Sequence, residues 1–169
     1  KGRLHTGGRT RTGNSMNEVK VFTIGFTKKT AEEFFSRLIR AGVKRVIDIR
    51  LNNVSQLAGF AKRDDLRYFL RTICSIDYIH YTDLAPSQEI LENFKQNKGR
   101  WEIYERDFLA LLNSRQVENK IKPELLNEAC LLCSEEKPTQ CHRRLVAEYF
   151  HSKWGNMKIN HLWAFSETI

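Results

Sequence analysis

Short apolar runs alternate with longer amphipathic segments along most of the chain, and this alternation constrains the fold more than any other feature. The segments of strand length and composition lie at residues 19–24, 44–50, 77–81, 128–134 and 156–162. Between them, apolar residues recur three or four positions apart, as on one face of a helix. Strands that alternate with helices favour a parallel sheet with both faces covered, and the near-continuous runs "VFTI" and "ACLL" agree with such burial. We therefore predict an α/β fold, with a mainly parallel five-stranded sheet in a Rossmann-like three-layer arrangement.

Local signals mark where several helices begin and end. Thr30 and Glu33 form a capping-box pattern at the start of the first helix. Gly42 suits its end, because glycine readily adopts the left-handed backbone that closes a helix. Further helices are predicted over residues 66–74, 86–99, 101–115 and 141–154, with a shorter one from Pro123.

Length and composition suit one domain. The chain has 169 residues, of which 41% are hydrophobic. Residues 1–15 hold four cations and no acid, and Met16 follows, so we interpret them as a disordered leader before a single domain at 16–169. Of the net charge of +8, these four cations account for half, and the remaining +4 permits a polyanionic partner without requiring one. Because we find no signal peptide and no run near the roughly 20 apolar residues of a membrane span, we expect a soluble cytoplasmic protein with no membrane partner.

The four cysteines do not resemble a secreted disulfide framework, so reduced thiols are the default. "CLLC" followed by "CH" offers four residues of zinc-binding type: Cys130, Cys133, Cys141 and His142. However, Cys130 and Cys133 lie three apart in a predicted strand, which points their side chains to opposite faces. We therefore expect no structural zinc and no other metal.

Polar residues follow several predicted strands at their carboxyl ends, where parallel sheets bind ligands. Asp48 and Arg50 end the second strand, Ser55 follows in the next loop, and Glu135 comes just after the fourth strand. Because these ends meet at one edge of a sheet, we expect the side chains to form one site. Arg50 and Ser55 are candidates for holding an anion there.

The first turn of the last predicted helix is unusually basic, with His142, Arg143 and Arg144 in succession. Free backbone N–H groups and the helix dipole make this end positive, so added cations oppose the dipole. Such cations make sense if Arg143 and Arg144 help to bind an anion. The alternative is that the two arginines only pair with nearby acids, namely Glu135, Glu136 or Asp48.

Cys141 and an aromatic stripe each admit a structural and a functional interpretation. A thiol at a helix start beside cations suits a nucleophile, but a free cysteine is more often part of the core. Trp101, Tyr104 and Phe108 share one helical stripe. We interpret that stripe as core in preference to a base-stacking surface.

The segments "FTIGFT", "VIDIRLNNVS", "YIHYTDLA" and above all "LLCSEEKPTQCHRRLVAEYF" resemble domain-of-unknown-function family 488, from residue 19 to about residue 162. The chain departs from the family pattern at Phe26, Asn53 and Ala85, where the family has histidine, proline and often glycine. The resemblance implies a compact α/β domain and supplies no reaction. The matching polar positions are Asp48, Arg50, Ser55, Cys133, Glu135, Cys141, His142 and Arg143.

These observations predict an enzyme-like pocket for a phosphate-bearing ligand, a nucleotide or a nucleic acid. Glu135 or Asp48 would act as general base and His142 would shuttle a proton, and a weaker hypothesis makes Cys141 a nucleophile. Gly25 has no glycine-rich continuation, so no dinucleotide fingerprint is present and we expect no cofactor. The alternative function is a nucleic-acid-binding accessory protein without turnover. The sequence does not indicate an oligomeric state.

Overall fold

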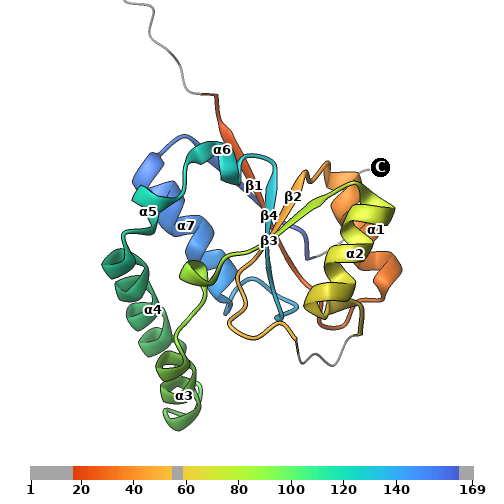
Figure 1. The fold of residues 1–169 in the computed structure, drawn as a ribbon. Coiled ribbons are helices and arrows are strands. Elements are labelled where there is room, and N and C mark those ends of the chain that lie inside the picture. The colour runs from red at the N-terminus through yellow and green to blue at the C-terminus, as the bar shows by residue number, and fades with distance from the viewer. Residues whose placement is uncertain (1–16, 55–58, 164–169) are drawn as a thin grey trace, which may run out of the picture.

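The computed structural model describes residues 17–54 and 59–163. The predicted leader and Ser55 lie outside the described residues. Five strands form a single sheet (Figure 1), namely β1 (Val19–Gly25), β2 (Arg45–Asp48), β3 (Asp77–His80), β4 (Ala129–Cys133) and β5 (Met157–His161). All strand pairs are parallel, and the sheet order is β3-β2-β4-β1-β5. The predicted α/β class and the parallel sheet are therefore confirmed.

Helices cover both faces of this sheet, as predicted (Figure 1). One face carries α1 (Ala31–Ala41) and α2 (Arg63–Cys74). The other carries α4 (Trp101–Arg115), α5 (Val117–Lys120), α6 (Pro123–Leu126) and α7 (His142–Trp154), and α3 (Gln88–Gln96) packs against α4. Two short 3₁₀ turns, η1 (Gly59–Ala61) and η2 (Thr82–Leu84), complete the described elements.

The strands divide their side chains between two hydrophobic cores. In β4, Leu131 and Cys133 belong to the core beneath α4 and α7, whereas Cys130 and Leu132 belong to the core beneath α1 and α2. All these side chains are fully buried. The sequence prediction that Cys130 and Cys133 face opposite sides of the sheet is therefore confirmed.

The ends of α1 follow the local chemistry of the sequence. The Thr30 hydroxyl oxygen accepts a hydrogen bond from the Glu33 backbone N–H at 3.1 Å, and the Glu33 carboxylate accepts one from the Thr30 N–H at 2.8 Å. This reciprocal arrangement is the predicted capping box. Gly42 closes the helix with a φ of 73°, a conformation that costs glycine little.

The connections of β2 and β4 open a crevice between these two neighbouring strands. After β2 the chain passes to α2 on one face, and after β4 it passes to α7 on the opposite face. The two loops therefore diverge at the carboxyl ends of adjacent strands. Such switch points are where open α/β sheets bind ligands.

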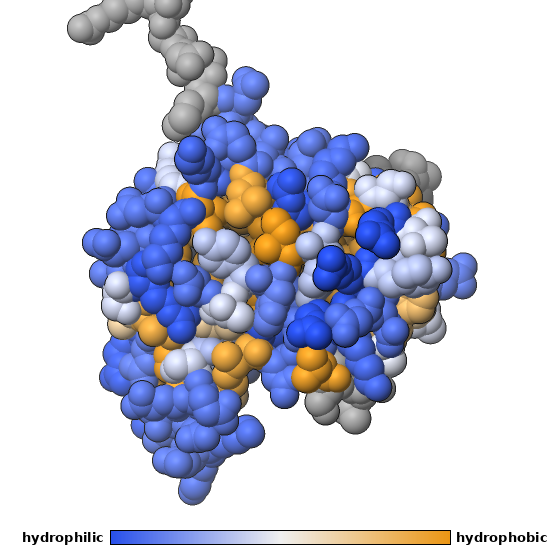
Figure 2. Space-filling model, in the orientation of Figure 1, coloured by the Kyte–Doolittle hydropathy of each residue, from blue (hydrophilic) through white to orange (hydrophobic). Residues whose placement is uncertain are grey.

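The helices α3 and α4 extend beyond the carboxyl ends of the strands (Figure 1). In the space-filling view, a notch separates the mainly hydrophilic lobe of α3 from the body of the domain (Figure 2). Within the described residues, no helix has the length and apolar character needed to cross a membrane.

Candidate functional site

A pocket of about 320 Å³ lies at the crevice between β2 and β4. Its lining includes Arg50 after β2, Cys133 and Glu135 at the end of β4, and Cys141 and His142 at the start of α7. Five of the site residues predicted from the sequence thus converge on one cavity. Its volume is at the lower end of the range for small-molecule sites, about 300–1,000 Å³.

Asp48 and Arg50 form a buried ion pair at the edge of this pocket. The Arg50 Nε donates to Asp48 Oδ1 at 2.8 Å, and Nη2 donates to Oδ2 at 2.7 Å. The exposed fraction is 0% for Asp48 and 3% for Arg50. Such a two-point pairing fixes the orientation of the guanidinium as well as its charge.

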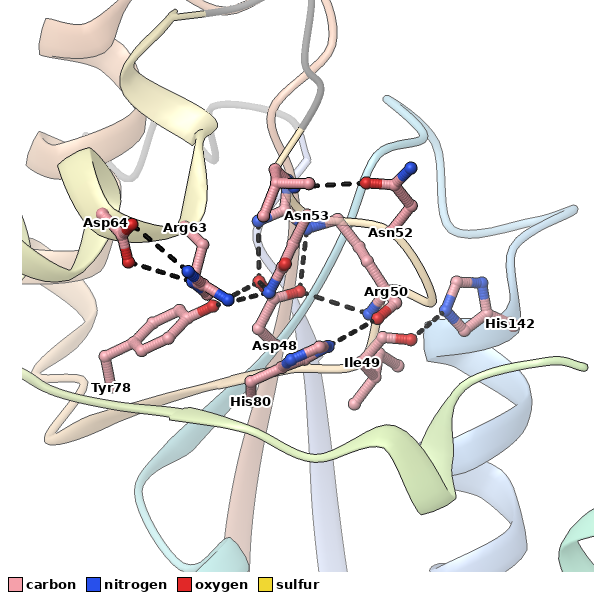
Figure 3. A network of polar contacts seen from close by, with 11 residues as sticks. Asp48, Ile49, Arg50, Asn52, Asn53, Arg63, Asp64, Tyr78, His80 and His142 are labelled. Atoms are coloured by element: carbon pink, nitrogen blue, oxygen red, sulfur yellow. Dashed lines mark hydrogen bonds and ion pairs between the residues drawn. The ribbon is translucent and has the colours of Figure 1, made fainter.

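Neighbouring strands and loops surround the Asp48 carboxylate with further donors (Figure 3). The Tyr78 hydroxyl on β3 donates to Oδ2 at 2.6 Å, and the Asn53 amide donates to the same oxygen at 3.3 Å. Burial alone would raise the pKa of the Asp48 carboxyl, but hydrogen bonds and charge from Arg50, with the Tyr78 bond, hold the pKa below its usual value. The carboxylate therefore stays ionised and serves mainly to position Arg50.

Tyr78 and His80 did not emerge as site residues from the sequence. His80 Nε2 forms a 2.8 Å hydrogen bond with the backbone oxygen of Arg50. Its place beside Asp48 follows from the pairing of β2 with β3. The Tyr78 hydroxyl, also on β3, has no feature in the nearby sequence that marks it as a partner of Asp48. Only knowledge of the strand order could have identified it.

Arg50 retains one nitrogen without a partner. Its Nη1 atom is buried and has no hydrogen-bond partner among the residues that the structure describes. The guanidinium lies over the ring of Phe26, with Cζ 5.3 Å from the ring centroid. An unsatisfied buried donor costs about 1–3 kcal/mol, so this atom is a strong candidate for binding a ligand.

His142 begins α7 and is tied to the end of β2. Its Nε2 lies 2.9 Å from the backbone oxygen of Ile49, which fixes Nε2 as the protonated nitrogen because the carbonyl can only accept (Figure 3). Burial lowers the pKa of His142 to about 4. The ring is therefore neutral at physiological pH, and its Nδ1 carries a lone pair.

Arg143 is directed toward the loop between β4 and α7 and is fully buried. Its Nη1 donates to the backbone oxygen of Glu135, and Nη2 donates to that of Glu136 at 3.0 Å. Nε donates to the Thr23 hydroxyl at 3.3 Å. Burial lowers the pKa of Arg143 to about 10, so the group remains charged at neutral pH. Its hydrogen bonds thus fix the loop between β4 and α7. Its positive charge lies next to the sulfurs of Cys133 and Cys141, which line the pocket.

Arg144 forms ion pairs, which was the alternative to anion binding considered from the sequence. Its partners are not the acids expected there. It pairs with Glu148 at 2.8 Å and with Glu105 at 3.4 Å. Its guanidinium also lies 6.0 Å from the ring centroid of Trp101.

Glu135 is exposed and lines the pocket, so its carboxylate is available for chemistry there.

The sulfur atoms of Cys133 and Cys141 lie against each other on the floor of the pocket. Arg143 Nη1 is 3.4 Å from each of them. The Cα atoms are 7.8 Å apart, beyond the roughly 4.4–6.8 Å that a disulfide spans. The sulfur contact is that of a bonded pair, whereas the backbone is wider than a disulfide allows, so the expectation of reduced cysteines stays a prediction for Cys133 and Cys141.

Aromatic side chains from α3 and α4 form the opposite wall of the pocket. Phe94, Trp101 and Tyr104 all line it. The rings of Trp101 and Tyr104 are stacked, with centroids 5.0 Å apart. Phe108 is fully buried in the core. The aromatic stripe is therefore core at its inner end, as predicted, and forms part of the pocket wall at its outer end.

Comparison with known proteins gives one result. A family model described as Domain of unknown function DUF488 matches residues 30–150. No curated protein and no solved structure gives a significant match. The matched range includes every residue of the Asp48–Arg50 network and the start of α7.

Proposed function

Because the chain belongs to the DUF488 family, whose description assigns no activity, we propose a function from the pocket itself: it binds the phosphate of a nucleotide or of a nucleic-acid end. The observation that carries this proposal is that Arg50 Nη1 has no hydrogen-bond partner among the described residues. Asp48 holds the guanidinium at two points and leaves this third donor for a ligand. A phosphate oxygen is a suitable acceptor, because arginine binds phosphate through strong charge-assisted hydrogen bonds.

The start of α7 adds a second source of positive potential to the same pocket. The helix has 13 residues, its first turn holds no acid, and its N-cap residue Cys141 makes no side-chain capping bond. Exposed N–H groups at such a terminus favour an anion. Arg143, just behind, brings a charge whose hydrogen bonds go to backbone oxygens, a hydroxyl and sulfurs instead of a carboxylate. That charge is available to attract an anion.

The aromatic wall supports a nucleotide over a simple phosphate. Trp101 and Tyr104 offer stacked rings across the pocket from the carboxyl ends of the strands. Stacking of a base on an aromatic side chain contributes about 1–3 kcal/mol. A ligand with a phosphate and a planar base would use both sides of the pocket.

For catalysis, Glu135 is the pocket residue best suited to act as general base. Its carboxylate is exposed at the pocket, whereas that of Asp48 is fully engaged with Arg50 and Tyr78. His142 is neutral at physiological pH and suits accepting a hydrogen bond better than shuttling a proton. The enzymatic proposal therefore assigns the base to Glu135 and a positioning role to Asp48.

The proposal is tested by thermal unfolding of the full chain with inorganic phosphate, a nucleoside monophosphate or the matching nucleoside. A ligand at 100 times its dissociation constant stabilises the folded state by about 2.7 kcal/mol, or several degrees for a chain of this size. We expect the monophosphate to stabilise most, phosphate less, and the nucleoside least.

The matched variants are Arg50→Lys and Arg106→Ala. The lysine keeps a cation beside Asp48 but lacks the spare guanidinium nitrogen, so we expect at least tenfold weaker binding of the monophosphate. Arg106 is exposed and pairs only with its neighbour Asp107 among the described residues, so its loss should leave binding unchanged. Equal stabilisation of wild type and Arg50→Lys by the monophosphate would refute the proposal.

The accessory-protein alternative has its own supporting observation. Arg63, Arg67 and Arg71 are exposed at four-residue spacing along α2. A basic stripe of this kind binds nucleic-acid backbones without a pocket. However, Asp64 and Asp65 lie in the same first turn, and Asp64 pairs with Arg63 at 2.9 Å. This partial neutralisation makes the stripe the second candidate.

A further inference from the structure

Three of the four zinc-type residues noted in the sequence converge on the pocket without the fourth. Cys133, Cys141 and His142 each bring a ligand atom to within 4.8 Å of the others, while Cys130 lies on the far side of the sheet. We propose that Cys133, Cys141 and His142 bind a divalent ion of the zinc class, with an open coordination position facing the pocket. This departs from the expectation of no metal, which rested on the four-residue set.

The three ligand atoms are close enough together to share a single ion. Zinc binds sulfur at about 2.3 Å and histidine nitrogen at about 2.0–2.1 Å. Two ligands of one tetrahedral ion are therefore roughly 3.5–3.8 Å apart. The three ligand atoms lie within 4.8 Å of one another; the two sulfurs, which touch each other in the unliganded chain, must rotate apart to reach that geometry.

The orientation of His142 is the one that a metal ligand requires. Metal-binding histidines usually donate their second ring N–H to a backbone carbonyl or a carboxylate, which fixes the tautomer. His142 Nε2 makes this bond to the oxygen of Ile49 at 2.9 Å. The Nδ1 lone pair is thereby free to coordinate an ion.

Arg143 supplies the outer contacts of the two sulfurs. Its Nη1 is 3.4 Å from Cys133 Sγ and 3.4 Å from Cys141 Sγ. Hydrogen bonds from a cation stabilise thiolates, which are the forms that bind metal. Two thiolates also balance the charge of a divalent ion, so Arg143 and the ion need not repel each other strongly.

A disulfide is the competing explanation for two adjacent sulfurs, and the backbone argues against it. With Cα atoms 7.8 Å apart, Cys133 and Cys141 are farther apart than disulfide-bonded residues normally are. An ion bound to both sulfurs, once they rotate apart, accommodates this Cα separation better than a direct bond does. The thiolate and imidazole donors favour zinc over magnesium or calcium, which prefer oxygen.

The three candidate ligands all line the pocket, so a fourth position would be open to water or a ligand. Three protein ligands with one open position are characteristic of catalytic zinc, whereas structural zinc has four. A bound ion would act there as a Lewis acid beside Arg50. The metal site shares the pocket with the proposed phosphate site but does not depend on phosphate binding.

The test uses the full chain, reduced and stripped of metal, in buffer without phosphate. Co²⁺ serves as the spectroscopic probe, because cobalt–thiolate coordination gives a charge-transfer absorption. We expect one equivalent of Co²⁺ to saturate this absorption, one equivalent of Zn²⁺ to displace it, and up to two thiol protons to be released per ion. The absence of a saturable thiolate absorption in the wild type would overturn the proposal.

Cysteine variants identify the ligands. Cys133→Ala and Cys141→Ala should abolish the absorption, whereas Cys130→Ala, buried on the other face of the sheet, and Cys74→Ala should retain it. In case a variant fails to fold, alkylation of the wild type is mapped by mass spectrometry with and without Zn²⁺. Zinc should protect Cys133 and Cys141 and should leave the labelling of Cys74 unchanged. Equal labelling of Cys133 and Cys141 with and without Zn²⁺ would overturn the proposal.

Arg50→Lys separates this inference from the proposed function. The variant should lose monophosphate binding and keep the stoichiometric cobalt absorption. A wild type that binds monophosphate but no metal would overturn only the metal site. A wild type that binds metal but no monophosphate would overturn only the phosphate site.

Discussion

At the scale of single residues, Asp48 shows how burial and pairing together set a charge. Its carboxyl is fully buried, yet Arg50 and Tyr78 hold its pKa below the usual value of 3.8. A carboxyl whose pKa is lower in the folded state stabilises that state above its unfolded pKa. The stabilisation is then lost as the pH falls through the folded-state pKa.

We predict that Asp48→Asn lowers the free energy of unfolding at pH 7 by about 3–5 kcal/mol, because it leaves Arg50 buried without its counter-ion. The deficit relative to wild type should begin to shrink below pH 3.8, where the unfolded wild-type chain protonates this carboxyl, and should shrink further as the pH falls through the lower folded-state pKa. Urea unfolding at pH 7, 5 and 3 measures both effects. Asp64→Asn, at an exposed ion pair, is the control and should change little. A deficit that is the same at pH 7 and pH 3 would contradict this account.

Arg143 is the residue for which sequence reasoning and structure differ most in emphasis. A cation in the first turn of a helix suggests anion binding, because the dipole disfavours it. The sequence does not reveal that the side chain turns back to the oxygens of Glu135 and Glu136. That contact depends on the path of the loop from 134 to 141, for which the local pattern carries no signal.

We predict that Arg143→Ala lowers the unfolding free energy by at least about 2 kcal/mol, because buried carbonyl acceptors lose their donors. The melting temperature should fall by about 4–8 °C or more for a chain of this length. Differential scanning calorimetry of the unliganded protein measures the change. Arg144→Ala loses two partly exposed ion pairs, a hydrogen bond to the backbone oxygen of Thr139 and the contact with Trp101, so it should shift the melting temperature less than Arg143→Ala, by about 2–4 °C. Unchanged stability together with lost phosphate binding would instead make Arg143 a direct anion ligand.

At the scale of elements, the end of β1 and the loop after β4 approach too closely for any side chain at Gly25. A Cβ built there would overlap the backbone oxygen of Glu135 and lie 2.8 Å from Arg143 Nη1. Thr27 also donates a backbone hydrogen bond to the oxygen of Ser134 at 3.1 Å. Gly25 is therefore needed for close packing of the two loops that adjoin the pocket.

We predict that Gly25→Ala destabilises the fold by about 1–3 kcal/mol or more, as expected for overpacking. It should also weaken monophosphate binding, because the β4–α7 loop must move. Gly59→Ala is the matched control, since a Cβ there meets no atom within 4 Å in the part of the chain that the structure describes. Chemical unfolding and ligand titration of both variants provide the measurements. Equal stability of the two variants would show that the loops separate without cost.

The elements themselves were largely predictable, because their signals are local. The capping box of α1, its Gly42 stop and the five strands all follow from spacing within a few residues. The sequence analysis preferred a core position for Trp101 and Tyr104 to a binding surface, because an aromatic stripe that lines a pocket has the same spacing as a core stripe. Only the position of α3 and α4 beyond the strand ends distinguishes the two.

At the scale of the whole molecule, the alternation of strands and helices predicts a parallel sheet but leaves the order of its strands open. The order β3-β2-β4-β1-β5 places β4 between β2 and β1. This insertion brings Cys133 and Glu135 next to Arg50, although more than 80 residues separate them. Convergence of polar residues at the strand ends was predictable from the parallel rule. Which of these residues would become neighbours was not predictable, because that depends on the strand order.

The whole-molecule question is whether nucleic acid binds through the pocket or along the basic stripe of α2. A pocket of about 320 Å³ has room for one terminal phosphate. Each phosphate neutralised on a single strand contributes about −0.7 to the slope of log K against log salt. We therefore predict a slope near −0.7 to −1.4 for a short 5′-phosphorylated oligonucleotide, corresponding to one or two phosphates.

The oligonucleotide without its 5′-phosphate should bind at least tenfold more weakly, because Arg50 then loses its acceptor. Fluorescence anisotropy over a series of salt concentrations measures both affinities, with a nucleoside monophosphate as competitor. The triple variant with Arg63, Arg67 and Arg71 changed to alanine should bind the phosphorylated strand nearly as well as wild type. If both strands bind equally, with a slope near −2.1 that the triple variant flattens, about three phosphates lie along the stripe, one for each arginine. That result would make the protein a nucleic-acid-binding accessory and leave the pocket without a role in nucleic-acid recognition.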